Sequence, residues 1–330
     1  MKRSRARLFK PTKANLAFLA RQLKRGLLVA APTETVYGLA GNALDPGAAR
    51  AIFAAKNRPS TDPLIVHVAT LAQARTVAEM SPEALRLARA HWPGPLTLVL
   101  PRRAIIPDEV TSGGDSVAVR MPSHPLFRRL ITLSGLPLAA PSANPFGYVS
   151  PTTALHVLDG LGSAIAYILD GGPSEIGLES TVLDLRNPAR PAVLRPGAIS
   201  AAVLSRTLGR PVAHHRRRAV RGAAIAPGLL KRHYSPKTPV VLHTRFTPRL
   251  LRQSAPDEAW LFLRSPGRGA PAHHVGLDRK GTLAGAARAL FAQLRALDTA
   301  GYRIIHAELA PGTDGLAAAL NDRLRRAAAR

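Results

Sequence analysis

The sequence contains no cysteine among its 330 residues. Disulfide bonds, cysteine-ligated zinc, iron–sulfur clusters and a thiol nucleophile are therefore excluded, and a reducing compartment fits. No apolar run reaches the ~18 residues that a membrane-spanning helix needs. The basic stretch 1–13 is not followed by the uninterrupted apolar segment and small-residue cleavage site of a secretory signal. We expect a cytoplasmic protein that makes no contact with a membrane.

Several catalytic templates are also missing. There is no G-x-x-x-x-G-K-[ST] phosphate loop, no G-x-S-x-G nucleophile turn and no H-E-x-x-H zinc motif. The histidines form no close pair at helical ligand spacing, so no protein-held metal is predicted. The acids Glu34, Glu179, Asp62 and Asp115 are scattered, which does not indicate the paired carboxylates of a glycosidase. They could instead help to hold a divalent cation on a polyphosphate.

Acidic residues are scarce. The chain has 20 acidic and 46 basic residues, which gives a formal net charge of +26. Such a charge suggests a nucleic-acid partner, but it is spread along the chain rather than gathered in one segment. Only 8 of the 46 basic residues are lysine, so a compositional bias toward arginine is an equally good explanation. We expect weak, salt-sensitive affinity for tRNA or other RNA in either case.

The apolar pattern predicts alternating helices and strands in the first two thirds of the chain. A helix is predicted over 14–25, a strand over 27–31, and a second helix from Pro46 to Lys56, with Asp45 as its N-cap. Further strands are predicted at 63–68, 96–100, 117–120, 138–140, 166–169 and 181–185, and further helices at 82–91 and 124–134. This alternation favours a mixed α/β layer architecture over a bundle or a sandwich.

The pattern changes near residue 206. Arginine, glycine and proline interrupt the apolar period there, and we interpret 211–238 as a linker. Beyond it, strands are predicted at 240–242 and 260–263 and helices at 282–298 and 314–329. The resulting organisation is a domain over 1–210, the linker, and a smaller α/β domain over 239–330.

Polar side chains follow several of the predicted strands. Apolar strands that end in hydroxyls and cations predict a polar cavity at one edge of a sheet. Because cations outnumber acids among these residues, we expect an anionic ligand that carries phosphate or carboxylate groups. The cations at these positions are Lys56, Arg58, Arg120 and Arg195.

Each of these residues also has a plainer interpretation. Lys56 and Arg58 follow a predicted helix end and could merely complement its dipole. His67 alone is better explained as a hydrogen-bonded core histidine, and Ser142 and Ser180 alone as turn residues. Arg120 directly follows an apolar strand, where an unpaired charge would be costly, so a ligand or ion-pair role is favoured there.

Six strings occur in order along the chain: PTETVYGL at 32–39, KNRP through PLIVH at 56–67, WPGPLT at 92–97, VAVRMP at 117–122, APSAN at 140–144 and ESTV at 179–182. Taken together, they resemble the threonylcarbamoyl-AMP synthase family, whose catalytic module is the YrdC-like domain. The resemblance covers about residues 14–205. A further string, 226–236, resembles the linker of the two-domain members.

The resemblance implies the fold and the reaction. The fold would be a YrdC-like twisted mixed sheet flanked by helices around a cavity, with a smaller Rossmann-like C-terminal α/β domain that gates the site. The reaction would join L-threonine, bicarbonate or CO2, and ATP into threonylcarbamoyl-AMP and pyrophosphate, with Mg²⁺ accompanying ATP. The product would pass to a tRNA threonylcarbamoyltransferase complex that modifies tRNA next to the anticodon.

Matching motif positions imply the residue roles. Lys56, Arg58 and Arg120 would be catalytic. L-threonine would contact Thr35, His67, Arg120, Ala140 and Ser180. ATP would contact Lys56, Arg58, Asp62, Ser116, Ser142, Ser150, Arg195 and Tyr234. Since Tyr234 belongs to the linker, that segment would cover the cavity mouth as a lid that shields a labile intermediate from water.

Two other classes of protein remain as alternatives at this point. One is a module that binds double-stranded RNA or tRNA, which the net charge would favour. The other is a carbamoyltransferase of hydrogenase maturation that uses a related domain. Such proteins carry cysteine-rich zinc segments, so the lack of cysteine counts against this second alternative.

Overall fold

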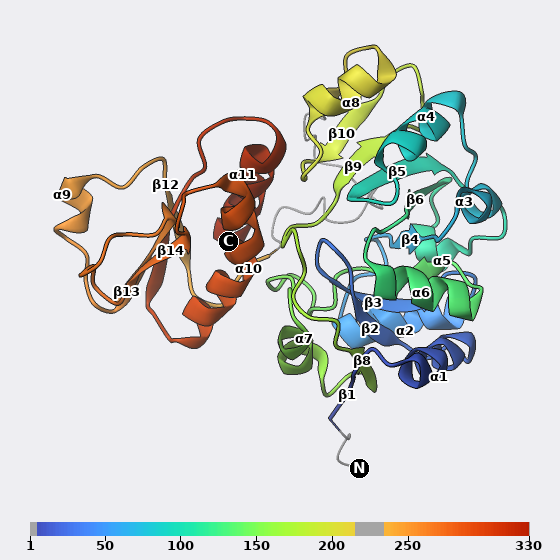
Figure 1. Ribbon diagram of the computed structural model, residues 1–330, viewed down its shortest axis with the longest axis horizontal. Helices are drawn as coiled ribbons and strands as arrows, with labels where there is room; N and C mark the ends of the chain where they lie inside the picture. Colours follow the sequence, from blue (N-terminus) through green and yellow to red (C-terminus); the bar gives the residue numbers. More distant parts are fainter. Residues whose placement is uncertain (1–4, 215–233, 330) are drawn as a thin grey trace.

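The computed structural model describes residues 5–214 and 234–329. They form a large α/β domain followed by a smaller one, which lies on the left of Figure 1. Most of the predicted linker, including 215–233 and therefore most of the string at 226–236, lies outside the described residues. Within the described residues, none of the helices combines the length and the apolar character needed to cross a membrane.

The large domain is built on a mixed sheet. Its 11 strands have the order β1-β8-β2-β3-β7-β4-β6-β5-β9-β10-β11. The strands are β1 (Arg7–Phe9), β2 (Val29–Pro32), β3 (Tyr37–Asn42), β4 (Ile65–His67), β5 (Leu96–Pro101), β6 (Ser116–Arg120), β7 (Leu138–Ala139), β8 (Tyr167–Leu169), β9 (Thr181–Asp184), β10 (Ala192–Arg195) and β11 (Ala213–His214). Since β11 pairs with β10, this sheet extends through His214.

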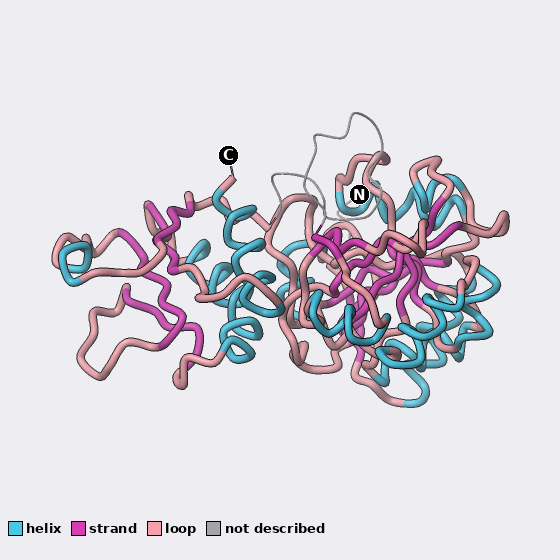
Figure 2. The backbone as a smooth tube through the Cα atoms, turned by 90° about the horizontal axis from the view of Figure 1, so that it is seen from above, coloured by secondary structure: helices cyan, strands magenta, loops and turns pink. Residues whose placement is uncertain are grey.

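Helices surround this sheet, as Figure 2 shows from above. They are α1 (Lys13–Lys24), α2 (Pro46–Lys56), α3 (Leu71–Val77), α4 (Pro82–His91), α5 (Asp108–Thr111), α6 (Pro125–Ser134), α7 (Ala154–Leu161) and α8 (Ala201–Leu208). Local chemistry sets their ends. The Asp45 side chain caps α2 by accepting from the Gly47 backbone N–H, and Asn57 ends that helix in the left-handed region with φ of 51°.

The predicted elements of this domain are confirmed, with ends shifted by one or two residues. Strand β3 was not predicted. Its sequence, 37–42, contains two glycines, and its residues are buried on both faces of the sheet, so they do not alternate between apolar and polar. Strand β10 and helices α3, α7 and α8 were also not predicted. Each of these elements has at most eight residues. That is too few for the apolar periodicity to decide between helix and strand.

Strand register brings the polar strand ends together. β4 and β6 are parallel neighbours, and His67 lies opposite Arg120. On the other side of β6, the antiparallel strand β5 places Thr97 opposite Arg120. Three polar residues from separate strands thus form one row across the sheet.

The smaller domain has a four-stranded parallel sheet with the order β12-β15-β13-β14. The elements are β12 (Val240–His243), α9 (Pro248–Leu251), β13 (Glu258–Arg264), β14 (His274–Asp278), α10 (Leu283–Thr299), β15 (Ile304–Glu308) and α11 (Gly315–Ala328). The helices predicted at 282–298 and 314–329 are α10 and α11, and the strands predicted at 240–242 and 260–263 lie within β12 and β13. The expectation of a second α/β domain is confirmed.

Helices α10 and α11 lie between the small sheet and the large domain in both Figure 1 and Figure 2. Their apolar faces share a buried cluster with Val36, Val149, Leu178 and Tyr234, which come from earlier parts of the chain. The two domains therefore share one apolar core at their boundary, and the segments around the polar strand ends belong to it.

Gly177 marks the closest approach across this boundary. Its φ is +79°, and a Cβ built there would lie 2.6 Å from the carbonyl oxygen of Ala287 and from the Cα of Arg288 in α10. Its backbone N–H donates to the carbonyl oxygen of Thr35 at 3.0 Å. Only glycine permits both the left-handed backbone and this contact.

We predict that Gly177→Ala loosens the two domains. The substitution adds the strain of a left-handed alanine, about 1–2 kcal/mol, to a backbone clash with α10. Gly172→Ala is the matched control, because Gly172 has φ of +82° but a Cβ added there would meet nothing within 4 Å. Thermal unfolding should show a clearly larger fall in midpoint for Gly177→Ala, and equal falls would contradict the predicted clash.

Candidate functional site

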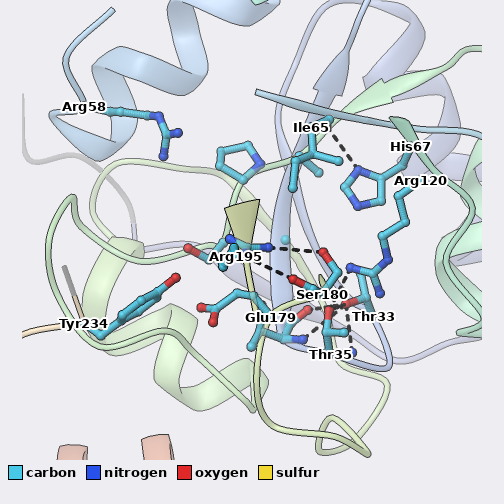
Figure 3. A pocket seen from close by; sticks show the side chains of 15 residues that line it. Thr33, Thr35, Arg58, Ile65, His67, Arg120, Glu179, Ser180, Arg195 and Tyr234 are labelled. Atoms are coloured by element: carbon cyan, nitrogen blue, oxygen red, sulfur yellow. Dashed lines mark hydrogen bonds between the residues drawn. The ribbon is translucent and has the colours of Figure 1, made fainter. Parts of the chain in front are cut away.

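A cavity lies against the ends of the polar strands, with a volume of about 50 Å³ (Figure 3). The residues predicted from the sequence that line it are Thr35, Arg58, His67, Arg120, Ala140, Ser142, Ser180, Arg195 and Tyr234. The predicted residues that do not line it are Lys56, Asp62, Ser116 and Ser150. The structure therefore gathers most of the predicted site around one hollow.

Arg120 is anchored on three sides. Its Nη2 lies 2.6 Å from Oε1 of Glu34, its Nη1 donates to Oγ1 of Thr35 at 2.9 Å, and its Nε donates to the carbonyl oxygen of Gly94 at 3.2 Å. The ion pair is almost completely buried. Burial raises the pKa of the Glu34 carboxyl, but Arg120 and nearby donors outweigh that effect and lower the pKa below 4.5. Glu34 is therefore ionised and neutralises the charge of Arg120.

His67 is buried beside Arg120. Its Nδ1 lies 3.2 Å from the carbonyl oxygen of Ile65, and its ring packs against Phe127 at 5.2 Å between ring centroids. Burial first, and the Arg120 charge second, lower the pKa of the imidazole to about 3. His67 is thus a neutral hydrogen-bonding group in this site, which also agrees with its plainer interpretation as a core histidine.

Arg58 also has a carboxylate partner. Its Nη2 lies 2.9 Å from Oδ2 of Asp62, and its Nε and Nη2 donate to the carbonyl oxygens of Asp62 and Pro63, both at 2.9 Å. Both side chains are buried. Asp62 therefore faces Arg58, and it fixes the direction of that guanidinium at the cavity.

Arg195 differs from the other two cavity arginines. Its Nε donates to the carbonyl oxygen of Ser180 and its Nη2 to the Ser180 hydroxyl, both at 3.1 Å. The Ser180 hydroxyl in turn lies 2.7 Å from Oγ1 of Thr97. Within residues 5–214 and 234–329, no carboxylate lies within 4.0 Å of this guanidinium. Burial first, and the nearby Arg323 and Arg326 charges, lower the pKa of Arg195 by more than Tyr234 and Glu179 raise it.

Two family descriptions match this chain. Residues 21–197 match the family described as "Telomere recombination", and residues 199–329 match "Threonylcarbamoyl-AMP synthase, C-terminal domain". The protein named threonylcarbamoyl-AMP synthase from Pyrococcus abyssi is 40% identical over 324 residues, which cover 92% of this chain and 91% of that protein. The chain belongs to the threonylcarbamoyl-AMP synthase family.

Two further comparisons agree with this assignment. The threonylcarbamoyl-AMP synthase of Bacillus subtilis is 39% identical over 323 residues, which cover 95% of this chain and 92% of that protein. The crystal structure of P. abyssi Sua5 complexed with L-threonine superposes with a TM-score of 0.88 at 37% identity and covers 98% of each chain. The predicted mixed α/β fold with a second, smaller α/β domain is confirmed, and the sheet of the smaller domain is parallel.

In this family member Lys56 does not line the cavity. Its Nζ donates to the carbonyl oxygens of Ser142 and Asn144, at 2.6 Å and 2.5 Å. Burial first, and the nearby Arg58 charge second, lower the pKa of the Lys56 ammonium well below 10.5. The structure therefore places Lys56 behind the 142–144 turn, where it fixes the cavity wall that Ser142 provides.

Ser116 and Ser150 also do not line the cavity. Ser116 begins β6 opposite Pro101, and it shares a sheet face with Arg120 but lies about 13 Å from it along the strand. Ser150 is buried, and its hydroxyl donates to Oε1 of Glu179 at 2.5 Å. Any contact of Ser116 with the ligand would require the ligand to extend along β6.

The sequence did not identify the partners of three residues of the site. Glu34 was noted as a scattered acid that could help to hold a divalent cation, whereas the structure pairs it with Arg120. Glu179 lines the cavity, and Arg323 from α11 lies 3.0 Å from its carboxylate. One signal was available for Arg323, because it falls on the apolar stripe of its helix with Leu320 and Leu324, where an arginine is unusual.

We predict that His67 stays neutral across the physiological pH range. Its folded-state pKa of about 3 lies below the ordinary 6.5, so the folded protein binds fewer protons than the unfolded chain between these values. The stability that His67 contributes is therefore fully present above pH 6.5 and is lost as the pH falls toward 3.

Side-chain ¹⁵N NMR of the imidazoles checks this, with the signal assigned by its disappearance in His67→Gln. The His67 signal should show no titration from about pH 8 to pH 5. A titration midpoint between pH 6 and 7 would contradict the buried, uncharged state.

Proposed function

We propose that this chain is a nucleotidyltransferase that forms threonylcarbamoyl-AMP and pyrophosphate from L-threonine, bicarbonate or CO2, and ATP. The observation that carries the proposal is a buried cavity lined by Arg58, Arg120 and Arg195 in a member of the threonylcarbamoyl-AMP synthase family. All three substrates carry anionic groups in this reaction, and a cavity rich in guanidinium groups suits them.

We place L-threonine at the Arg120 end of the cavity. The planar guanidinium can bind both oxygens of the threonine carboxylate, which a lysine cannot do as well. Thr35 already contacts Arg120, and the Ala140 backbone, Ser180 and neutral His67 line the same hollow. The similarity to P. abyssi Sua5, whose structure was determined with L-threonine, supports this placement.

We place the ATP phosphates near Arg195. This is the cavity arginine without a carboxylate within ion-pair distance among the described residues, and a buried charge without such a partner favours an anionic ligand. Ser142 and Arg58 line the adjoining wall. Adenosine would extend over the apolar patch of Ile65 and Ala118 toward Ser116, which shares that sheet face.

The protein's own part in this reaction is binding and charge stabilisation. The neutral threonine amine would add to CO2 and release one proton to water, which gives a carbamate, and a carbamate oxygen would attack the α-phosphorus while pyrophosphate leaves. No step needs a nucleophile from the protein, so fixed arginines that oppose the growing negative charge can supply the catalysis. The Arg58–Asp62 and Arg120–Glu34 pairs hold two of these guanidinium groups in place before substrate arrives.

Mg²⁺ would arrive with ATP, held by its phosphate oxygens. The described residues include no group of three His, Asp or Glu side chains arranged to hold a metal ion. The protein side of the cavity instead offers guanidinium and hydroxyl donors, which suit the phosphate oxygens that the ion leaves free.

The cavity must widen to take its substrates. Its volume of about 50 Å³ admits a few water molecules, whereas small-molecule sites generally measure roughly 300–1,000 Å³. Tyr234 lies on the cavity wall, fully buried, with its ring 5.4 Å from that of Phe291. We propose that the Tyr234 side chain moves aside when ATP enters and then closes over it, as a lid against water.

The product would pass to a tRNA-modifying threonylcarbamoyltransferase complex in the cytoplasm. A mixed anhydride between a carbamate and a phosphate is labile in water, so its consumer must act soon after release. The absence of cysteine is consistent with a reducing compartment. The net charge of +26 supports weak, salt-sensitive contact with tRNA.

We predict that pyrophosphate release from ATP requires both L-threonine and bicarbonate. A coupled assay with purified protein, Mg²⁺ and ATP should show release only when both are added, because the carbamate is the attacking group. Omission of each compound in turn is the control. Release that continues at the same rate without threonine would refute the proposed reaction.

We also predict that Arg120→Lys weakens threonine use selectively. Lysine keeps the positive charge opposite Glu34, so the fold should survive, but it loses the two-oxygen grip on a carboxylate. The KM for threonine should rise about tenfold, a loss of roughly 1.4 kcal/mol, while the KM for ATP stays within about twofold of the wild-type value. Unchanged threonine saturation would remove Arg120 from the threonine site.

A further inference from the structure

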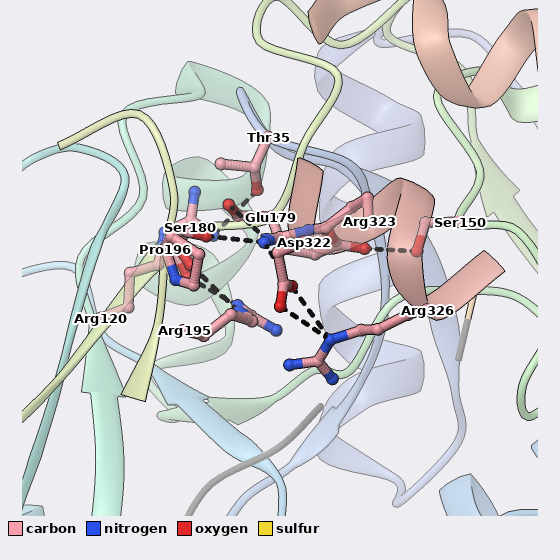
Figure 4. Close-up of polar contacts among 10 residues, drawn as sticks. All are labelled: Thr35, Arg120, Ser150, Glu179, Ser180, Arg195, Pro196, Asp322, Arg323 and Arg326. Carbon is pink, nitrogen blue, oxygen red and sulfur yellow. Dashed lines mark hydrogen bonds and ion pairs between the residues drawn. The ribbon is translucent and has the colours of Figure 1, made fainter. Parts of the chain in front are cut away.

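Helix α11 of the smaller domain brings a fully buried arginine to the edge of the cavity. The Nε of Arg323 lies 3.0 Å from Oε2 of Glu179, and its Nη2 donates to the carbonyl oxygen of Glu179 at 3.2 Å (Figure 4). Its Nη1 donates to the carbonyl oxygen of Pro196 at 2.6 Å. One side chain of the smaller domain thus contacts two separate segments of the large domain.

These two segments are the ones that carry Ser180 and Arg195. Glu179 precedes Ser180, and Pro196 follows Arg195, while Arg195 itself donates to Ser180. Arg323 therefore joins the segment that carries Ser180 to the segment that carries Arg195, and these two residues are hydrogen-bonded to each other. Since an arginine fork has a rigid planar geometry, it fixes the spacing of the two segments as well as joining them.

Arg323 also neutralises the carboxylate that faces the cavity. Among the described residues that line the cavity, Glu179 is the one with an acidic side chain. A carboxylate there would repel threonine, carbamate and triphosphate alike if it had no counter-charge. At an effective dielectric constant of about 20, two like charges anywhere within about 10 Å of each other repel by more than the equivalent of a tenfold change in affinity.

The helix supports Arg323 in this role. Asp322 lies 3.2 Å from Nη1 of Arg323 and 3.0 Å from Nε of Arg326. Both guanidinium groups also lie against the ring of Tyr234, at 5.5 Å and 6.0 Å from its centroid. Burial lowers the pKa of Arg323, but Tyr234, Glu179 and Asp322 together outweigh burial and raise the pKa above its ordinary value. Arg323 is therefore charged when the smaller domain is docked.

We propose that Arg323 is a positioning residue for nucleotide binding. It favours the binding of anions in the cavity because it neutralises Glu179 and holds Arg195 against Ser180. This inference rests on the proposed function, because it takes ATP as the ligand at Arg195. Arg323 gives the smaller domain a direct part in substrate binding, because the cavity has the charge that suits an anionic ligand only while α11 is docked.

The alternative is that Arg323 has a purely structural role, as one more contact between the domains. The experiment must distinguish this role from the proposed role in nucleotide binding. Arg295 of α10 offers the matched control. It is also a buried arginine that crosses the boundary, where its guanidinium donates to the carbonyl oxygens of Val149 and Ser150. It has no contact with Glu179 in the described structure and does not line the cavity, so its loss should loosen docking without exposing a carboxylate to the ligand.

The test measures binding of α,β-methylene-ATP with Mg²⁺, an analogue that cannot release pyrophosphate, by isothermal titration to the full-length chain. The variants are Arg323→Gln, Glu179→Gln, Arg295→Gln, and each arginine variant combined with Glu179→Gln. Thermal unfolding of every variant is recorded in parallel, so that loss of docking and loss of affinity are read separately.

We expect Arg323→Gln to raise the dissociation constant about tenfold and the added Glu179→Gln to restore it to within about threefold of wild type. Arg295→Gln should lower the unfolding midpoint while the dissociation constant stays within about threefold, with or without Glu179→Gln. Equal weakening by the two arginine variants, or failure of Glu179→Gln to rescue Arg323→Gln, would overturn the proposal.

Glu179→Gln alone covers the case in which Arg323→Gln does not fold. It removes the negative charge of Glu179 from the cavity while Arg323 stays charged, so the analogue should bind more tightly, and weaker binding would overturn the proposal. The readout does not depend on catalysis. A wild-type chain that binds the analogue but forms no product would reject the proposed reaction alone, whereas a wild-type chain that does not bind the analogue would contradict both.

Discussion

Buried arginine is costly unless an acid or an anionic ligand accompanies it, and this constraint organises the cavity. Arg58 has Asp62, Arg120 has Glu34, and the acid Glu179 has Arg323. The exception among the described cavity residues is Arg195, which is held by Ser180 through neutral groups. The ion pairs fix the guanidinium groups of Arg58 and Arg120 and nearly neutralise them, so the charge of Arg195 remains available to a ligand.

The sheet supplies the geometry that makes such pairing possible. The parallel pair β4 and β6 places His67 next to Arg120, and antiparallel β5 adds Thr97 to the same row. The row connects to Ser180 through the Thr97 hydroxyl. Groups placed by strand register need no rearrangement when charge develops in a reaction, which is the condition under which electrostatic catalysis is most effective.

The smaller domain completes this arrangement rather than standing apart from it. Its two long helices form a shared apolar core with residues such as Val36 and Leu178 that adjoin the cavity segments. Gly177 allows the backbone of that segment to approach α10, and α11 adds Arg323. The fold thus connects the position of a whole domain to the charge that a substrate meets.

Much of this could be predicted from the sequence. Long apolar periods marked α4, α6, α10 and α11 nearly to their ends, because a repeat that covers several turns leaves little ambiguity. The position of Arg120 after an apolar strand favoured a ligand or ion-pair role, and the structure places Arg120 on the cavity wall in an ion pair with Glu34. Local sequence signals were sufficient wherever one element alone determines where a residue lies.

Long-range pairing could not be predicted in the same way. Nothing near Glu34 in the sequence indicates that it neutralises Arg120, 86 residues later, and nothing near Glu179 indicates Arg323. Lys56 was assigned to phosphate because it is a cation within a motif, whereas the structure places it on two carbonyl oxygens. Such contacts depend on strand order and domain docking, which the apolar pattern does not encode.

The measurement that tests this account most directly is a crystal structure of the full chain with L-threonine and α,β-methylene-ATP bound. The account predicts the threonine carboxylate within hydrogen-bonding distance of the Arg120 guanidinium and the triphosphate against Arg195. It would be contradicted by ligands that occupy another hollow, such as the groove beside Tyr148 and Arg295, while the arginine-lined cavity holds neither.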